Sequence, residues 1–223
     1  MPDLNQFHES VRKGNLEAVR AALTENPALL DQTNDAGQNA FVLAKYYRQE
    51  AVANDLLGRR PRLDIFGSCI AGRTDDVVAE LDRDPDLLNA HSRDGWTPLH
   101  LASFFGWPEL ANVLVERGAS LEARSTNPSS NTPLHAAAAG GQSAVVRLLL
   151  EQGADANARQ EAGWTALHSA AQAGNRAMVE DLVAHGADVN ARAANHQSPL
   201  DLALTGAKQE MVTLLEALGA KLQ

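Results

Sequence analysis

The sequence contains little cysteine and no long apolar run. With Cys69 as the one cysteine among 223 residues, an intrachain disulfide cannot form, and we expect a buried, structural thiol rather than a reactive one. No stretch approaches the roughly 20 apolar residues that span a bilayer. The N-terminal segment from Met1 to Gln6 lacks a basic start followed by an apolar run, so no secretory signal is visible. We therefore expect a cytoplasmic protein.

Basic residues are also few. There are 19 Lys and Arg against 28 Asp and Glu, a formal net charge of −9, and most of the acidic excess lies in residues 65–223. Because an acidic surface repels phosphate groups, we expect neither nucleic acid nor a membrane surface as a partner. Arg59, Arg60 and Arg62 are the one basic concentration. We interpret them as a solvated helix end, with an anion or partner contact as the alternative.

Motifs for catalysis or cofactor binding are missing as well. The sequence has no Gly-rich phosphate loop, no H-E-x-x-H, no paired cysteines and no G-x-S-x-G. His100, His135 and His168 recur at regular intervals, but packed helices lie roughly 8–10 Å apart, whereas zinc ligands sit about 2 Å from the metal. We expect these histidines to make structural hydrogen bonds. No catalytic residue, metal site or cofactor is predicted.

Asp82, Asp84 and Asp86 resemble the start of a calcium-binding loop. The glycine and glutamate that such a loop needs at its sixth and twelfth positions are Leu87 and Arg93 here. We therefore expect a solvated turn.

The chain does contain a repeated tetrapeptide with a clear structural meaning. A Thr or Ser caps a helix by accepting a backbone N–H, and proline fits the first helical position, where its missing donor costs nothing. A glycine about twenty residues later fits a left-handed helix end. The tetrapeptides, spaced by 35, 33 and 33 residues, are Thr97-Pro98-Leu99-His100, Thr132-Pro133-Leu134-His135, Thr165-Ala166-Leu167-His168 and Ser198-Pro199-Leu200-Asp201.

This T-P-L-H-x-A pattern at a 33-residue period resembles the ankyrin repeat, most clearly over residues 94–223. The style, with degenerate N-terminal repeats followed by regular ones, is similar to bacterial ankyrin-repeat domain proteins. The resemblance implies an all-α ankyrin-repeat solenoid of helix-turn-helix repeats. It also implies general protein binding, without fixing the partner.

Residues 1–93 repeat less regularly, but a shift of 58 residues aligns Gly14 with Gly72 and Pro27 with Pro85. The segment 58–64 runs almost directly into the next helix, so one projecting loop, or finger, is missing there. We expect degenerate repeats in 1–64 and regular repeats with a C-terminal cap in 65–223. The seven expected repeats span 3–34, 35–64, 65–91, 92–124, 125–159, 160–192 and 193–223, and the inner helices are expected to begin near Asn39, Thr97, Thr132, Thr165 and Ser198.

Aromatic residues make up only 4% of the chain, yet they cluster. Because large rings commonly anchor partners, we predict an exposed partner-binding patch; the alternative is that the rings cover one another at the 58–64 seam. Trp107 is also compatible with bracing the turn before Pro108. The predicted partner-binding residues are Trp96, Phe104, Phe105, Tyr46, Tyr47 and Trp164.

Two further surface features bear on partner binding. The finger at 125–131 is two residues longer than the others, which we interpret as neutral, with a contact role as the alternative. Residue pairs at the ends of the inner helices are expected to face the concave groove of the solenoid. These pairs are Arg12/Lys13, Tyr46/Tyr47, Ile70/Ala71, Phe104/Phe105, Ala139/Gly140, Gln172/Ala173 and Thr205/Gly206.

The sequence thus predicts a non-catalytic, monomeric module that binds a partner protein through its concave groove and finger loops. The alternative is a regulatory subunit of an enzyme, or an enzyme with an unrecognised site at the 58–64 seam. A self-associating structural scaffold is a third possibility.

Overall fold

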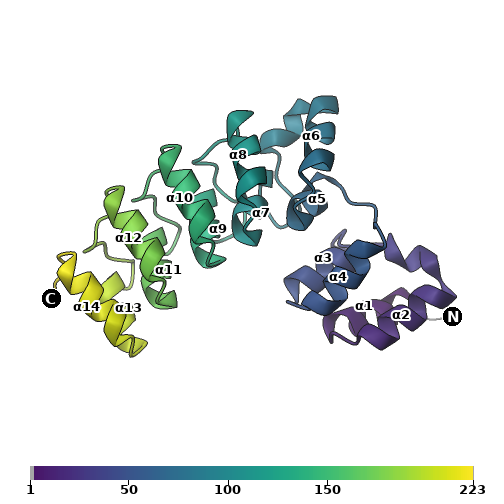
Figure 1. The fold of residues 1–223 in the computed structure, drawn as a ribbon, viewed down its shortest axis with the longest axis horizontal. Coiled ribbons are helices and arrows are strands. Elements are labelled where there is room, and N and C mark those ends of the chain that lie inside the picture. The colour runs from purple at the N-terminus through teal and green to yellow at the C-terminus, as the bar shows by residue number, and fades with distance from the viewer. Residues whose placement is uncertain (1–2, 223) are drawn as a thin grey trace. The chain divides into compact units, whose positions relative to one another are not determined.

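A computed structural model describes residues 3–222 (Figure 1). Met1 and Pro2, the start of the segment interpreted as lacking a secretory signal, lie outside the described residues, as does Gln223. The described residues form fourteen α-helices, two short 3-10 helices and no strand, with one isolated antiparallel bridge between Thr33 and Asn39. The predicted all-α class with fourteen helices is confirmed.

Each repeat contributes an inner helix followed by an outer helix. The inner helices are α1 (Leu4–Arg12), α3 (Ala40–Tyr46), α5 (Ile65–Ala71), α7 (Pro98–Phe105), α9 (Pro133–Ala139), α11 (Ala166–Ala173) and α13 (Pro199–Thr205). The outer helices are α2 (Leu16–Glu25), α4 (Glu50–Gly58), α6 (Thr74–Arg83), α8 (Pro108–Glu116), α10 (Ser143–Glu151), α12 (Arg176–Ala184) and α14 (Gln209–Ala217).

The chain divides into two compact units, residues 1–71 and 72–223, called here the N-terminal and C-terminal units. In the N-terminal unit, α1 packs against α3 and α2 against α4. In the C-terminal unit, α7, α9, α11 and α13 pack in succession, as do α8, α10 and α12 (Figure 1). The predicted division into residues 1–64 and 65–223 stays a prediction.

The inner helices begin where the cap residues predicted them. Asn39, Thr97, Thr132, Thr165 and Ser198 are the N-caps of α3, α7, α9, α11 and α13. Each has extended backbone angles, which turn the chain into the helix. The side chains of Asn39, Thr97, Thr132 and Ser198 each accept a hydrogen bond from the backbone N–H three residues later.

Small side chains let successive inner helices approach closely. One position of the inner helix holds a fully buried alanine in each of the last four repeats, namely Ala102, Ala137, Ala170 and Ala203. Because alanine adds no bulk beyond its Cβ, the next helix can pack directly over it. Cys69 is also fully buried and unoxidised, as the sequence predicted.

The turn between paired helices is braced by the following repeat. Gly72 has a φ of +68°, a left-handed conformation that glycine adopts without strain. A Cβ atom there would lie 2.7 Å from Cδ2 of Trp107. Gln142 occupies the position of Trp107 one repeat later, where its Nε2 donates to the Phe104 carbonyl at 3.2 Å. The ring of Trp107 therefore occupies a position at which the next repeat carries the hydrogen-bonding side chain of Gln142.

Two loops expected to be turns contain a single turn of 3-10 helix. These are η1 (Pro27–Leu30) and η2 (Pro85–Asn89). Asn26 and Asp84 cap them through bonds of 3.2 Å to the backbone N–H two residues later. Proline at the first position of each fixes φ and initiates the turn.

The basic concentration after α4 is a solvated helix end. Arg59 pairs with Asp55 at 2.9 Å, and Asp55 also accepts a hydrogen bond from Arg20 at 2.7 Å. Arg62 lies on the surface near Asp31, 3.7 Å away. The pair between Arg20 and Asp55, which joins α2 to α4, has a counterpart in the C-terminal unit, where Arg147 of α10 pairs with Asp181 of α12 at 3.1 Å. Charged residues of the outer helices therefore link neighbouring repeats in both units.

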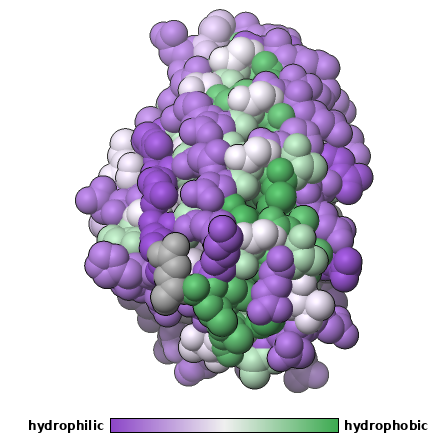
Figure 2. Space-filling view, turned by 90° about the vertical axis from the view of Figure 1, so that its left-hand side faces the viewer, coloured by the Kyte–Doolittle hydropathy of each residue, from purple (hydrophilic) through white to green (hydrophobic). Residues whose placement is uncertain are grey.

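Apolar residues gather on the C-terminal end face that Figure 2 views. Two large apolar residues of the last repeat are exposed, Leu204 by 43% and Leu222 by 64%. The positions that correspond to Leu204 one and two repeats earlier hold Ala171 and Ala138, both buried.

Among the described residues, no helix is both long and apolar enough to cross a membrane.

Candidate protein-binding surface

The recurring histidines tie each inner helix to the finger of the next repeat. Nδ1 of His100 accepts from the backbone N–H and the hydroxyl of Thr97, at 3.3 and 2.8 Å. Nε2 lies 2.9 Å from the Asn131 carbonyl oxygen. Because a carbonyl oxygen only accepts, Nε2 carries the proton and the ring is neutral. The equivalent bonds join His135 to the Trp164 carbonyl and His168 to the Gln197 carbonyl, both at 3.1 Å.

Burial keeps these rings uncharged. It lowers the pKa of His100 to about 4, against the smaller, opposing effect of the bond to the Asn131 carbonyl. Burial also lowers the pKa of His135 and His168. No group of three or more metal-ligating side chains occurs among residues 3–222. As the sequence predicts, these histidines make hydrogen bonds that join each helix to a finger.

A column of arginines links successive fingers by hydrogen bonds. The sequence analysis does not predict this column. Nη1 of Arg124 donates to the Ser130 carbonyl of its own finger at 3.1 Å and to the Arg159 carbonyl of the next repeat at 2.5 Å. Arg159 repeats the arrangement with the carbonyls of Gly163 and Arg192, at 3.0 and 2.6 Å. Each guanidinium thus donates to carbonyls in two successive fingers, which fixes the spacing of the fingers.

The long finger at 125–131 is internally ordered and contacts both neighbouring fingers. The Ser125 hydroxyl accepts from the Asn131 N–H at 2.8 Å. The Thr126 N–H donates to the Gly95 carbonyl at 2.9 Å, and the Glu161 N–H donates to the Ser129 carbonyl at 3.0 Å. The additional residues therefore belong to a hydrogen-bonded row of fingers.

Three of the predicted partner-binding residues lie together in the C-terminal unit. The rings of Trp96 and Phe104 meet edge to face with centroids 5.2 Å apart, and Phe104 and Phe105 meet in the same way at 5.2 Å. Trp96 also lies 5.9 Å from the His100 ring. All three side chains are half-buried. We call Trp96, Phe104 and Phe105 the aromatic cluster.

The other predicted residues lie apart from the aromatic cluster or in the other unit. The half-buried Trp164 stacks on His168 with centroids 5.7 Å apart. Tyr46 and Tyr47 belong to the N-terminal unit and are 37% and 51% exposed. The guanidinium of Arg12 lies 5.9 Å from the centre of the Tyr47 ring, within the range of a cation–π contact.

One residue of the expected groove is misplaced. Ile70 is only 3% exposed, so it belongs to the core of its repeat and not to an accessible surface. The sequence pattern placed it by its distance from Gly72 alone. An apolar side chain near a helix end is buried whenever the neighbouring elements cover it, which spacing does not reveal.

The inner helices of the C-terminal unit carry almost no charge. Together α7, α9, α11 and α13 contain no Lys, Arg or Glu, and one Asp, Asp201. The carboxylate of Asp201 accepts from the Ser198 N–H at 2.8 Å, and this backbone hydrogen bond is the main cause of its lowered pKa. The charged residues of this unit therefore lie on its outer helices, fingers and loops.

The family model described as ankyrin repeats in three copies matches residues 68–160 and 153–223, more than half of the chain. Those matches contain the Thr-Pro-Leu-His caps and the histidine column described above. The chain belongs to the ankyrin-repeat family. Ankyrin repeats are generally protein–protein interaction modules and are typically non-catalytic.

A curated protein resembles a short part of this ankyrin-repeat chain. It is serine/threonine-protein kinase VIK of Arabidopsis thaliana, 43% identical over 44 residues. The match covers 20% of this chain and 10% of the kinase. A likeness over a tenth of that protein concerns a short segment, not its whole length.

Proposed function

We propose that this ankyrin-repeat chain is a non-catalytic module that binds a partner protein through its fingers and the ends of its inner helices. The aromatic cluster of Trp96, Phe104 and Phe105 is the proposed central anchor. Tyr46, Tyr47 and Trp164 supply further aromatic contacts. The partner surface is built from the concave groove and finger loops that the repeat family implies.

The observation that carries this proposal is the aromatic cluster on an otherwise uncharged set of helices. Its three half-buried rings hold one another edge to face, so little side-chain entropy remains to be lost on binding. Aromatic residues in such settings commonly dominate binding free energy. The adjoining fingers are fixed by the arginine and histidine columns, so the partner meets a preorganised surface.

The test is affinity capture from the native cell extract with mass spectrometry. The unmodified chain is compared with the triple variant Trp96→Ala, Phe104→Ala, Phe105→Ala. A matched control carries Val113→Ala, Val115→Ala and Leu148→Ala, which truncates half-buried apolar residues of α8 and α10. Circular dichroism of all three proteins establishes whether the helices are retained.

We expect the aromatic variant to keep its helicity and lose its captured partners, while the control keeps both. If helicity and partners are lost together in the aromatic variant, the cluster is part of the core. If both persist, partner binding is centred elsewhere.

A further inference from the structure

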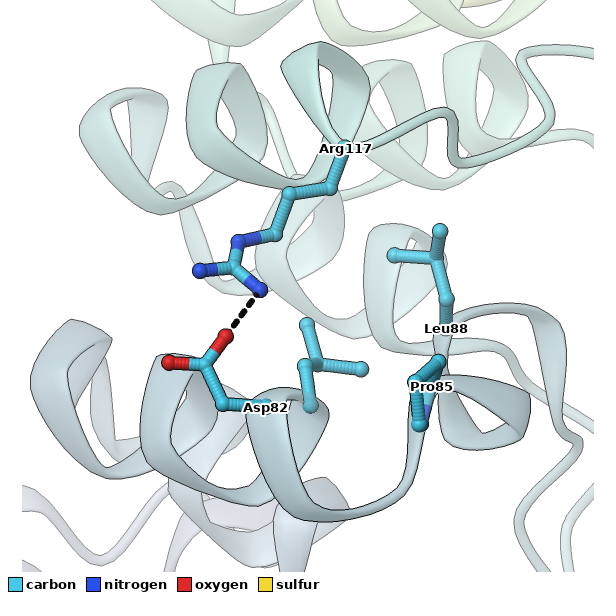
Figure 3. Close-up of a pocket in the computed structure, with 5 residues that line it drawn as sticks. Asp82, Pro85, Leu88 and Arg117 are labelled. Atoms are coloured by element: carbon cyan, nitrogen blue, oxygen red, sulfur yellow. Dashed lines mark hydrogen bonds and ion pairs between the residues drawn. The ribbon is translucent and has the colours of Figure 1, made fainter.

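A pocket of about 420 Å³ opens between α6, η2 and the end of α8 in the C-terminal unit (Figure 3). Its lining residues are Leu81, Asp82, Pro85, Leu88 and Arg117. Leu81 is only 3% exposed and borders the pocket from the core. The accessible apolar surface comes from the half-buried Leu88 and from Pro85, which begins η2. The volume lies within the range of about 300–1,000 Å³ that is typical of ligand pockets. We call these five residues the outer pocket.

The outer pocket lies beside η2, between the outer helices α6 and α8. Elsewhere in this unit α8 packs on α10 and α10 on α12, whereas η2 packs against α6 and α7. One side of the pocket is closed by an ion pair, Arg117 Nη1 to Asp82 Oδ1 at 2.7 Å (Figure 3). Both partners are accessible to water, so this pair is weak and exchangeable.

The segment that forms the outer pocket is strongly acidic. Residues 74–89 hold six acidic side chains and one basic side chain, Arg83. The six acidic residues are Asp75, Asp76, Glu80, Asp82, Asp84 and Asp86. Asp82 is the one of the six that lines the outer pocket, and the others lie along the same segment. An apolar recess with an acidic segment at its edge complements an apolar side chain that has cationic neighbours.

The N-terminal unit shows that the fold does not require this charge. Fifty-eight residues earlier, the apolar framework is the same, with Leu23, Pro27 and Leu30 at the positions of Leu81, Pro85 and Leu88. The acidic residues nearest the pocket are not repeated, although Glu17 corresponds to Asp75. Thr24, Asn26 and Ala28 stand where the outer pocket has Asp82, Asp84 and Asp86.

We propose that the outer pocket is a second partner-binding site, which takes a leucine- or phenylalanine-sized side chain flanked by lysine or arginine in a partner polypeptide. The apolar side chain packs against Pro85 and Leu88, with the buried Leu81 beneath. The flanking cation replaces Arg117 on Asp82 and is further attracted by Asp84 and Asp86. This site uses none of the aromatic cluster, so it stands independently of the function proposed above.

The probe is a phage-displayed library of random dodecapeptides, selected on the full chain and counter-selected on the variant Leu88→Lys. That substitution places a cation in the outer pocket. Enriched peptides are then synthesised with a fluorescent label, and their affinities are measured by anisotropy. Leu30→Lys, at the corresponding position of η1, is the matched control for the same change outside the acidic segment.

A second variant removes the charge with residues the fold already accepts. In Asp82→Thr, Asp84→Asn, Asp86→Ala, the outer pocket receives the side chains of the N-terminal unit, including the asparagine that caps η1. Thermal unfolding followed by circular dichroism checks that all variants fold.

We expect the enriched peptides to carry Lys or Arg within two positions of a Leu, Ile or Phe. Their affinity should fall about tenfold or more in the triple variant and in Leu88→Lys, stay unchanged in Leu30→Lys, and weaken as salt is raised. The proposal is overturned if no peptide survives counter-selection, if the enriched peptides lack basic residues, or if they bind the triple variant as tightly as the unmodified chain.

Discussion

His100 of one repeat donates a hydrogen bond of 2.9 Å to the backbone carbonyl of Asn131 in the next. The same ring accepts two hydrogen bonds from Thr97, the cap of its own helix. One neutral imidazole therefore joins a helix start to the finger that follows. This dual role makes the protonation state of the histidine column a determinant of stability.

Acidification is expected to destabilise the C-terminal unit through these rings. The folded-state pKa of His100 is about 4, below the unfolded value near 6.5. Between these values the unfolded chain binds more protons, so stability is fully present above about pH 6.5 and declines as the pH falls. By pH 4, the contribution of His100 to the free energy of unfolding has fallen by an amount on the order of 3 kcal/mol.

Urea unfolding at pH 7, 5.5 and 4.5 measures this decline, with His100→Gln as the comparison. The pKa values of Asp55 and Asp201 are lowered, so their contribution to the free energy of unfolding also falls in acid. This loss is the same in both proteins. The variant should therefore show a shallower pH dependence. Equal slopes for the two proteins would contradict a role for His100.

Thr132→Ala is expected to destabilise the chain by about 0.5–2 kcal/mol, because the variant loses both the cap of α9 and the hydroxyl bound to His135. That hydroxyl lies 2.8 Å from Nδ1 of His135 and is fully buried. Urea unfolding at neutral pH measures the loss. Thr213→Ala on the exposed face of α14 is the control and should change stability by less than about 0.5 kcal/mol.

Arg159→Met is expected to cost about 1–3 kcal/mol, because it leaves carbonyls in two fingers without a charged donor. Arg147→Met removes the surface ion pair with Asp181 and should cost about 0–1 kcal/mol. Thermal or urea unfolding distinguishes the two. A loss for Arg159→Met no larger than that for Arg147→Met would show that the arginine column does not hold the fingers.

Residues 1–64 are expected to exchange their amide hydrogens faster than the inner helices within 133–174. The inner helices within 133–174 are packed between neighbouring inner helices on both sides, whereas the N-terminal unit has fewer repeats and an unpartnered buried Nε2 on His8. In a nearest-neighbour array the weakest interface opens first. Hydrogen exchange read by mass spectrometry tests this, and equal protection of both segments would refute it.

Much of the fold could be predicted because it repeats. The 33-residue spacing of Thr-Pro-Leu-His identified the helix starts to the residue, and Asn39 was recognised without the full motif because its side chain can cap. These inferences needed only local chemistry and a period.

The candidate site was less predictable because it depends on which side chains meet across repeats. The sequence placed Trp96, Phe104 and Phe105 in one patch, but their edge-to-face contacts follow from the path of the finger. Ile70 was assigned to the groove and is buried. The arginine column was missed, although Arg124, Arg159 and Arg192 recur at nearly the repeat spacing and could have revealed it.

The sequence by itself determined the helices, their caps and the order of the repeats, because each depends on residues within a few positions of one another. Only the tertiary structure decided the carbonyl partners of His100 and Arg124, the contacts within the aromatic cluster and the existence of the outer pocket. Leu81 and Arg117, which line that pocket, are 36 positions apart. Their approach is set by how one repeat stacks on the next, and a linear pattern contains no such distance.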